Sequence, residues 1–176
     1  LAEFVTGLQA QAISADLSAF VPGRKVDDNV NVLLRFGEAR GMLWASQVAS
    51  GASNALRLRV YGTRASLHFD QEQPEQLWLA PRGEPARLLR RGLPPQTQTQ
   101  PGDQRVPAGH PEGYLEAFGN LYRNFIFTVR AKINGEQPKD EWLDFPSVNE
   151  GVRGMAFVNN VIESGLSDVK WKEFVV

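Results

Sequence analysis

The sequence predicts an α+β fold, in which an open and mostly antiparallel β-sheet of about six or seven strands has helices packed on one face. Three observations support this class. Apolar and polar residues alternate with period two from Ile13 to Arg91. The connections between these runs are too short for the crossovers that parallel strands need. Stretches with helical spacing follow in the last third of the chain, and the length of 176 residues suits a single domain over residues 1–176.

The chain opens inside a helical pattern. The first apolar stripe consists of Leu1, Phe4, Val5 and Leu8. No Ser, Thr, Asp or Asn precedes this stripe as a capping residue, and no initiating Met is present. We therefore expect that an N-terminal part of the protein precedes Leu1.

The strands are predicted one by one from their alternation. They cover residues 13–19, 29–36, 42–48, 56–60, 65–69, 76–80 and 86–91, with a possible edge strand at 171–175. A turn over residues 37–41 joins the second strand to the third. The outer face of the predicted sheet also carries Leu33, Leu43, Ala45, Tyr61 and Trp78. This apolar surface predicts a subunit interface, and an error in the assumed register is the alternative explanation.

A long loop and two helices complete the predicted fold. Residues 92–112 are rich in Pro, Gln, Thr and Gly, which is typical of a loop. Pro111 and Glu112 suit the first turn of a helix whose apolar stripe continues to Val129, and we expect this helix to lie across the sheet. A capping-box pattern of Ser147 and Glu150 begins the last helix.

The composition argues against several classes of function. Lys and Arg number 19 against 20 Asp and Glu, so charge gives no reason to expect nucleic acid or an anionic membrane as partner. The lack of Cys excludes thiolate zinc sites and fits a cytoplasmic location. No apolar run reaches the roughly 18 to 20 residues that span a bilayer. With two histidines and no glycine-rich phosphate loop, we expect no histidine-rich metal site and no phosphate-binding loop for a cofactor in this chain.

The longer loops are predicted to share one end of the sheet. Each strand of the meander reverses direction, so the loops at 21–28, 51–54 and 92–112 meet there, and functional residues concentrate in such loops. The candidate substrate-binding residues are His110, Tyr114, Arg24 and Lys25. Asp27 and Asn54 lie in the same loops.

A structural role is the alternative for each candidate. His110 would bond to a substrate or transfer a proton, or the backbone at a helix entrance would satisfy its ring. Tyr114 would offer its hydroxyl to a substrate or pack on the apolar stripe. Arg24 and Lys25 would hold an anion or a polyol, or would stay solvated. His68 is interpreted as a surface or interface residue, and the rings of Trp44 and Trp78 as packing residues.

Four segments in sequence order carry a family resemblance, at residues 1–7, 20–24, 109–118 and 150–155. Together with the meander, they resemble the C-terminal domain of the Gfo/Idh/MocA oxidoreductases over essentially the whole chain. The resemblance implies a preceding Rossmann domain that binds NAD or NADP, and a sugar or polyol pocket approached by the stretch from His110 to Tyr114. It also implies dimers or tetramers built through the sheet. The lysine of the family's Glu-Lys-Pro motif and its catalytic histidine have no counterpart here.

We therefore expect the substrate-binding and oligomerisation domain of an NAD(P)-dependent oxidoreductase, inactive by itself and without a cofactor of its own. Its expected partners are a small sugar or polyol and further copies of the chain, with no nucleic acid and no membrane. The alternative is a stand-alone binding or scaffold module that uses the same fold without redox chemistry.

Overall fold

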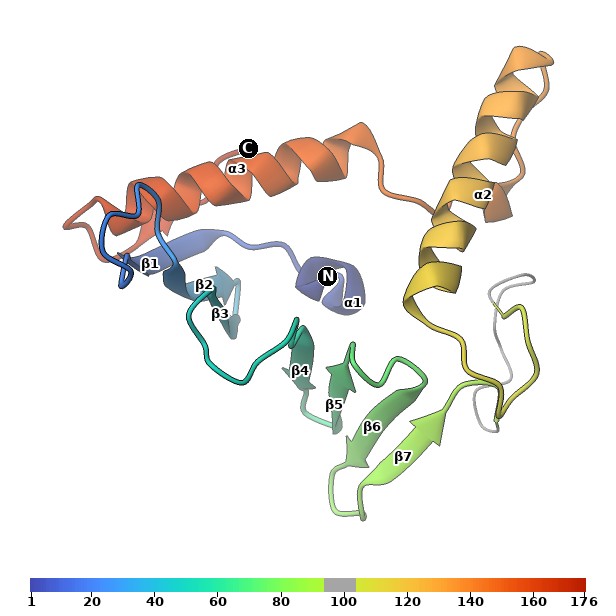
Figure 1. Ribbon diagram of the computed structural model, residues 1–176, viewed down its shortest axis with the longest axis horizontal. Coiled ribbons are helices and arrows are strands. Elements are labelled where there is room, and N and C mark those ends of the chain that lie inside the picture. The colour runs from blue at the N-terminus through green and yellow to red at the C-terminus, as the bar shows by residue number, and fades with distance from the viewer. Residues whose placement is uncertain (94–103) are drawn as a thin grey trace. The chain divides into compact units, whose positions relative to one another are not determined.

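The computed structural model describes residues 1–93 and 104–176, which form two compact units (Figure 1). The first unit comprises residues 1–52 and 146–176, and the second comprises residues 53–145. Residues 94–103 of the stretch predicted as a loop over 92–112 lie outside the described residues. The single domain expected from the chain length stays a prediction, and each unit is described below by itself.

The first unit is a four-stranded antiparallel sheet with a long helix packed against it. Its elements are α1 (Ala2–Thr6), β1 (Ala12–Ser18), β2 (Asn29–Phe36), β3 (Ala39–Ser46), α3 (Val148–Gly165) and β8 (Lys172–Glu173). The strand order is β3-β2-β1-β8, so the predicted edge strand at the C-terminus is confirmed. The core of the unit consists of Ile13, Val32, Leu34 and Val161.

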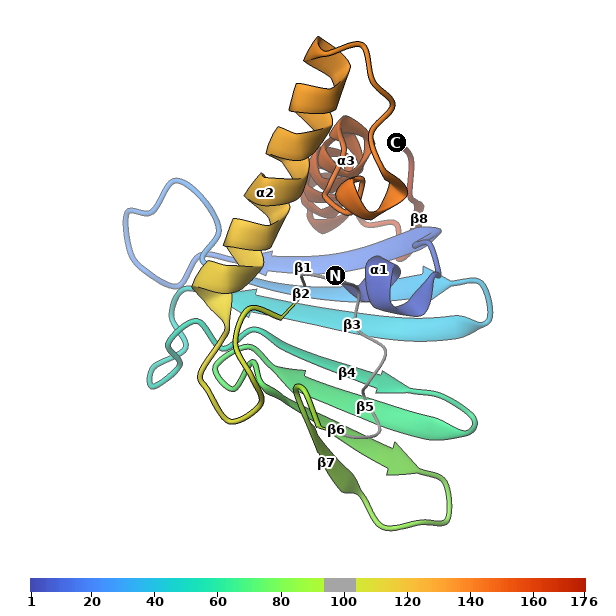
Figure 2. The same cartoon turned by 90° about the vertical axis from the view of Figure 1, so that its right-hand side faces the viewer.

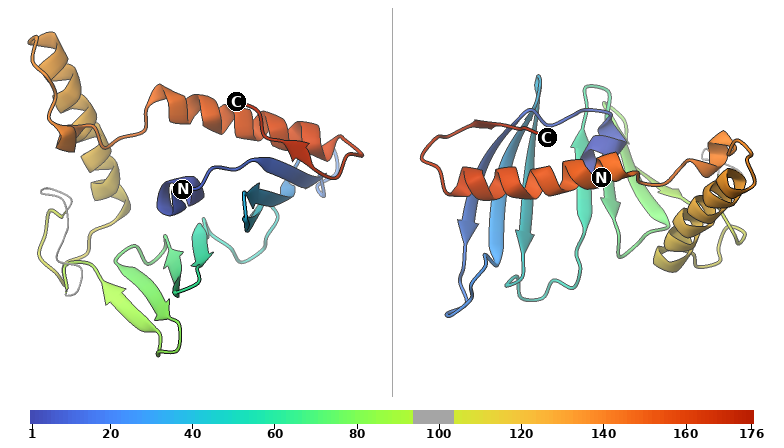
Figure 3. Two further views of the ribbon diagram at one scale, coloured as in Figure 1. Left: turned by 180° about the vertical axis from the view of Figure 1, so that it is seen from behind. Right: turned by 90° about the horizontal axis from the view of Figure 1, so that it is seen from above.

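Helix α3 runs across the strands of this sheet (Figure 3) and is fixed to β1 at its last turn. The hydroxyl oxygen of Ser164, a buried residue, accepts the backbone N–H of Ala15 at 3.0 Å. A Cβ atom at Gly165 would lie 2.0 Å from Cδ1 of Leu17, so only glycine leaves room for this leucine. The capping box predicted at the other end is confirmed, because Ser147 donates its backbone N–H to Glu150 at 2.8 Å.

A bidentate ion pair ties α1 to α3. The two guanidinium nitrogens Nε and Nη2 of Arg153 donate to the two carboxylate oxygens of Glu3, each at 2.7 Å. Glu3 also accepts the backbone N–H of Ala10 at 2.7 Å, and Arg153 lies 4.6 Å above the ring of Phe174. The hydrogen bond from Arg153 holds the pKa of Glu3 below its ordinary value.

We expect Glu3→Gln to lower the free energy of unfolding by about 1 kcal/mol at neutral pH, since a partly exposed bidentate pair is screened by solvent. The pKa of Glu3 is lowered from 4.5, so the contribution of its charge is fully present above that pH and is lost as the pH falls through the lower folded-state value. The stability gap between the two proteins should therefore narrow in acid. Urea unfolding at several pH values measures this gap, and a gap that is constant from neutral pH to acid would contradict the assignment.

The hairpin between β2 and β3 is tighter than predicted. Phe36 pairs with Ala39, so the turn contains only Gly37 and Glu38. Gly37 has a φ of 63°, the left-handed conformation that two-residue hairpin turns require and that glycine adopts without strain. A shift of one residue in the pairing moves every side chain of a strand to the other face of the sheet, so this turn decides which way β3 faces.

The side chains of β3 accordingly face opposite to the prediction. Leu43 and Ala45 pair with inward-facing residues of β2 and lie on the inner face, whereas Met42 and Trp44 lie on the outer face. Met42 is 78% exposed and Trp44 is 60% exposed, and the indole nitrogen of Trp44 donates to Asn29 at 2.8 Å. The interpretation of Trp44 as a packing residue is therefore wrong within this chain.

The second unit contains the other four-stranded antiparallel sheet (Figure 2). Its elements are β4 (Arg57–Tyr61), β5 (Ala65–Asp70), β6 (Gln76–Pro81), β7 (Arg87–Arg90), α2 (Tyr114–Ile133) and the 3₁₀ helix η1 (Asp140–Trp142). The α+β class and the antiparallel pairing are thus confirmed. The strands are hydrogen-bonded in two groups of four, where the sequence predicts one sheet of about six or seven strands.

Helix α2 packs against η1 and leads away from the strands of its own unit (Figure 1). The ring of Phe127 lies 5.2 Å from that of Trp142, and the ring of Phe125 lies 5.6 Å from that of Phe145. The hydroxyl of Thr128 donates to the carbonyl of Trp142 at 3.0 Å. The prediction that this helix lies across the sheet is wrong for β4–β7. Within residues 1–93 and 104–176, no helix is long and apolar enough to cross a membrane.

Candidate functional site

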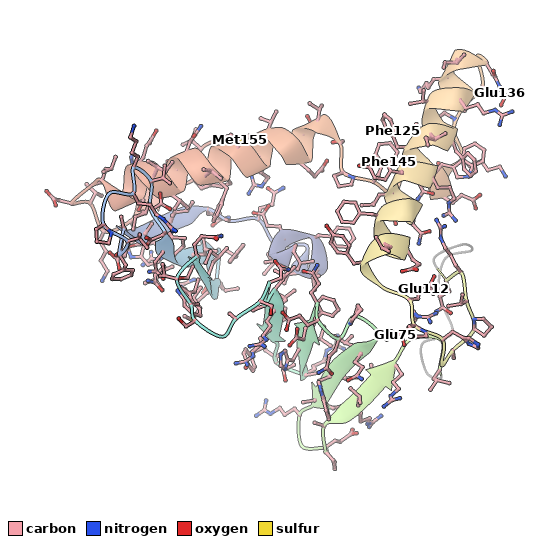
Figure 4. The ribbon with its side chains drawn as sticks, viewed as in Figure 1. Glu75, Glu112, Phe125, Glu136, Phe145 and Met155 are labelled. Carbon is pink, nitrogen blue, oxygen red and sulfur yellow. The ribbon has the colours of Figure 1, made fainter. Side chains whose placement is uncertain are left out.

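A polar cluster of the second unit lies at the N-terminal end of α2, which we call the foot of this helix (Figure 4). Residues 104–113 contain no helix or strand and lead into α2. A backbone of this kind needs other partners for its N–H and C=O groups. Three side chains supply these partners, namely Glu75, Arg91 and Glu112.

Arg91 is the centre of this cluster. Its Nη2 donates to Glu75 at 3.1 Å and to the carbonyl oxygen of His110 at 2.8 Å. Its Nη1 donates to the carbonyl oxygen of Val106 at 3.1 Å and lies 2.7 Å from Oε2 of Glu112. The side chain of Arg91 is 17% exposed and that of Glu112 only 4% exposed, so this ion pair is shielded from solvent.

The two carboxylates of the cluster also accept backbone N–H groups. Glu75 accepts the N–H of Glu112, and Glu112 accepts the N–H of Arg105, each at 2.7 Å. The hydrogen bond from Arg91 is the main cause that lowers the pKa of Glu75 below its ordinary value. Glu75 is therefore ionised at neutral pH and takes no part as a general acid.

The helix begins later than the sequence predicts. Its first residue is Tyr114 and its N-cap is Gly113, so Pro111 and Glu112 precede the helix. The backbone N–H of Gly113 donates to the carboxylate of Glu116 at 2.8 Å, and this bond lowers the pKa of Glu116. Glu112 lies before the first turn, and its carboxylate pairs with the partly buried Arg91.

His110 lies at the surface in the turn that precedes the helix. Its backbone N–H donates to the carbonyl oxygen of Pro107 at 3.2 Å, and its ring nitrogen Nδ1 lies 3.2 Å from the same oxygen. A carbonyl oxygen can only accept, so this second bond requires the ring proton on Nδ1. The ring is thus bonded to backbone, as the structural alternative for His110 foresees, and Nε2 of the neutral ring is left as an acceptor.

Tyr114 lies beside an open groove of about 520 Å³ between the turn at residues 73–76 and residues 111–116. Its side chain is 60% exposed, and its ring centroid lies 4.8 Å from that of Phe118. The hydroxyl is therefore accessible, while one side of the ring packs on the helix. His110 and Tyr114 both lie in the second unit, on either side of the short segment that leads into α2, and only Tyr114 lines the groove.

Arg24 and Lys25 lie in the first unit, in the loop between β1 and β2. The buried carboxylate of Asp28 closes this loop by accepting the backbone N–H groups of Phe20 at 2.9 Å and Val21 at 3.0 Å. These bonds lower the pKa of Asp28. Nη1 of Arg24 lies 3.5 Å from Asp28, so Arg24 already has a partner in its own loop, whereas Lys25 is exposed. The meeting of all four candidates at one site stays a prediction.

Sequence reasoning missed Arg91, Glu75 and Glu112. The pairing of Glu75 with Arg91 could have been predicted. The strands predicted at 76–80 and 86–91 form a hairpin, and this hairpin places Glu75 opposite Arg91. Opposite charges at facing ends of a hairpin indicate a cross-strand pair. The third member, Glu112, reaches Arg91 only through the path of the loop, which no local pattern specifies.

Each of the two long helices has a carboxylate of its own at its start. Phosphates bind at helix N-termini with free N–H groups, but the carboxylates of Glu116 and Glu150 already occupy the starts of α2 and α3. A second negative charge at these positions would be repelled. In the described ranges there is no group of three or more His, Cys, Asp or Glu side chains that could hold a metal ion.

Comparisons with known proteins point to one family. Residues 1–68 match the model of the GFO/IDH/MocA C-terminal domain. An oxidoreductase from Sinorhizobium meliloti is 42% identical, has a TM-score of 0.86, and is matched over 97% of this chain and 48% of its own. An inositol dehydrogenase homologue from Azotobacter vinelandii, solved with NADH and myo-inositol, is 30% identical with a TM-score of 0.87, over 98% of this chain and 46% of its own.

A curated relative agrees with these structures. The uncharacterised oxidoreductase YfiI of Bacillus subtilis is 29% identical over 169 residues, which are 95% of this chain and 43% of that protein. The chain thus spans about half the length of the relatives it matches. The antiparallel fold, the matched segment and these relatives agree with the resemblance found in the sequence. The chain therefore matches the C-terminal domain of the GFO/IDH/MocA family, by the family model over residues 1–68 and by these relatives over nearly its whole length.

Proposed function

We propose that this chain is the substrate-binding and oligomerisation part of an NAD(P)-dependent oxidoreductase that transfers hydride to or from a sugar, a polyol or a related compound. The observation that carries the proposal is the exposed ring of His110, which bonds to Pro107 through Nδ1 and leaves Nε2 as an acceptor, one residue before Pro111 in the lining of the groove. Relatives solved with NADH and myo-inositol or levoglucosan support the substrate class and the nicotinamide cofactor. A cytoplasmic location, favoured by the lack of Cys, belongs to the same proposal.

The chemistry of the cluster suits a substrate with several hydroxyl groups. Nε2 of His110 can accept a hydroxyl proton in a hydrogen bond, and the Tyr114 hydroxyl can donate or accept. Neither group is charged in these roles, which suits the hydroxyl groups of an uncharged ligand. The nicotinamide is expected to bind outside the described residues, since their helix N-termini are already capped.

We expect His110→Ala to lower kcat/KM for the polyol substrate about tenfold in the full-length oxidoreductase, because one hydrogen bond to the substrate is lost. The midpoint of thermal unfolding should stay unchanged, since the ring is exposed and its one bond to a described residue goes to the backbone of Pro107. His68→Gln, at the other histidine of this chain, serves as the control. Unchanged kinetics in His110→Ala would reduce this residue to a turn-stabilising role.

We expect the chain to form a dimer or a larger assembly in solution. The outer face of the first sheet carries the exposed side chains of Leu33, Met42 and Trp44, a continuous apolar strip on paired strands. Trp44→Glu should shift sedimentation velocity profiles toward the monomer, whereas Leu166→Glu, at a residue that is 86% exposed near the end of α3, should not. A strictly monomeric wild-type chain at micromolar concentration would overturn this part of the proposal.

The alternative function is a stand-alone binding or scaffold module with the same fold. The coding sequence upstream of Leu1 separates the two. A strand-turn-helix unit with a G-x-G-x-x-G pattern supports the oxidoreductase, because its glycines let the backbone approach a pyrophosphate. A start codon immediately before Leu1 would favour the stand-alone module.

A further inference from the structure

The turn that carries His110 is held at both ends by one guanidinium group. The turn spans residues 107–110, and the N–H of His110 donates to the carbonyl of Pro107 across it. Gly109 has a φ of 87°, as the third residue of a type II turn requires. Arg91 donates to the carbonyl of Val106, just before the turn, and to the carbonyl of His110, at its end.

We propose that Arg91, with Glu75 and Glu112, is a positioning residue that fixes the His110 ring with its proton on Nδ1 and its Nε2 presented as a hydrogen-bond acceptor for a substrate hydroxyl. The substrate part of this inference rests on the proposed function. The positioning part concerns the ring alone and can be tested without a substrate.

The ring depends on the shape of this turn because its only described hydrogen bond goes to Pro107 inside the same turn. If the ends of the turn separate, the carbonyl of Pro107 leaves the plane of the imidazole and the ring rotates freely. Free imidazole side chains prefer the proton on Nε2, the nitrogen that is presented outward here. Loss of the turn would thus convert the outward nitrogen from an acceptor into a donor.

Arginine is needed at position 91 because of its planar fork. Nη1 and Nη2 together reach two backbone carbonyls and two carboxylates at distances between 2.7 and 3.1 Å. The ammonium of a lysine is a single point with three donors and cannot satisfy four acceptors on two sides. Glu75 and Glu112 hold the fork in place and also bind the N–H groups of Glu112 and Arg105, so the segment is attached on both sides of the turn.

The test uses NMR of the histidine rings, because the chain contains only two histidines. Ring ¹⁵N shifts of the 176-residue chain are measured at about pH 8.5, where imidazoles are neutral, and His68→Gln assigns the two signals. Arg91→Lys is the test variant. Arg87→Lys is the matched control, since Arg87 lies on the same hairpin but pairs with Glu84 at the surface. Amide hydrogen exchange of His110 and Glu112 is recorded on the same samples.

In the wild-type chain and in Arg87→Lys, His110 should show the proton on Nδ1. In Arg91→Lys, the form with the proton on Nε2 should become the major species, and exchange of the two amides should become at least about tenfold faster. A wild-type ring with its proton on Nε2, or a folded Arg91→Lys chain with the wild-type ring signal, would overturn the proposal. If Arg91→Lys does not fold, Glu75→Ala decides in the same way, because it removes one acceptor of the fork. Failure of the proposed function would give a different result. In that case kcat/KM would be unchanged in His110→Ala, while the NMR spectrum would still show the proton on Nδ1 of the His110 ring.

Discussion

Glu112→Ala should lower the free energy of unfolding by about 3 kcal/mol, because it leaves the shielded charge of Arg91 with only one of its two carboxylates. The backbone N–H of Arg105 loses its acceptor in the same variant. Glu112→Gln should cost less, because its amide oxygen can still accept that N–H. Urea-induced unfolding followed by circular dichroism measures the three proteins.

The control for this prediction is Glu84→Ala. Glu84 pairs with Arg87 in the same unit, but both side chains are more than half exposed, and such pairs contribute between about 0 and 1 kcal/mol. The comparison therefore isolates the effect of shielding from solvent. Equal losses in Glu112→Ala and Glu84→Ala would show that the Arg91 cluster is no stronger than a surface pair.

Ile13→Ala should destabilise the first unit by about 3 kcal/mol, since a large aliphatic side chain is removed from a closed core. Ile13 has no exposed surface and packs with Val32, Leu34 and Val161 between β1, β2 and α3. The loss combines the transfer free energy of three carbon atoms with the cost of the cavity that remains. Thermal and urea unfolding of the variant give its size.

Leu166→Ala is the control for Ile13→Ala. It also shortens an aliphatic side chain, but Leu166 is 86% exposed and its backbone is in a conformation that alanine adopts without strain. We expect a change within about 0.5 kcal/mol. A loss in Leu166→Ala as large as in Ile13→Ala would mean that the core lies elsewhere.

Local patterns predicted most elements of this fold. The alternation of β1 and β2 has the same period as their pairing, with Ile13, Val32 and Leu34 on the buried face. The capping box at Ser147 and Glu150 marks the first turn of α3 because its hydrogen bonds form between residues three positions apart. Such signals are readable because both partners lie within a few residues of each other.

The predictions were wrong where the conformation of a segment depends on residues that are distant in the sequence. A turn of two residues and a turn of five fit the sequence around Gly37 equally well, and the longer one reverses the faces of β3. Likewise, Glu112 fits the first turn of a helix by composition, but its carboxylate pairs with Arg91, which lies 21 positions earlier in the sequence. The start of α2 at Tyr114 follows from that pair and from the cap formed by Glu116.

For the candidate site, the sequence by itself determined which residues carry useful chemistry and that His110 precedes a helix. Its family resemblance determined the domain type, which the comparisons confirm. The tertiary structure decided that the His110 ring bonds to Pro107, that Arg24 pairs with Asp28, and that Arg91 holds the turn at the foot of α2. Periodicity reports which face of an element is buried. It carries no information on which of many charged side chains meet, because that depends on how the loops close in space.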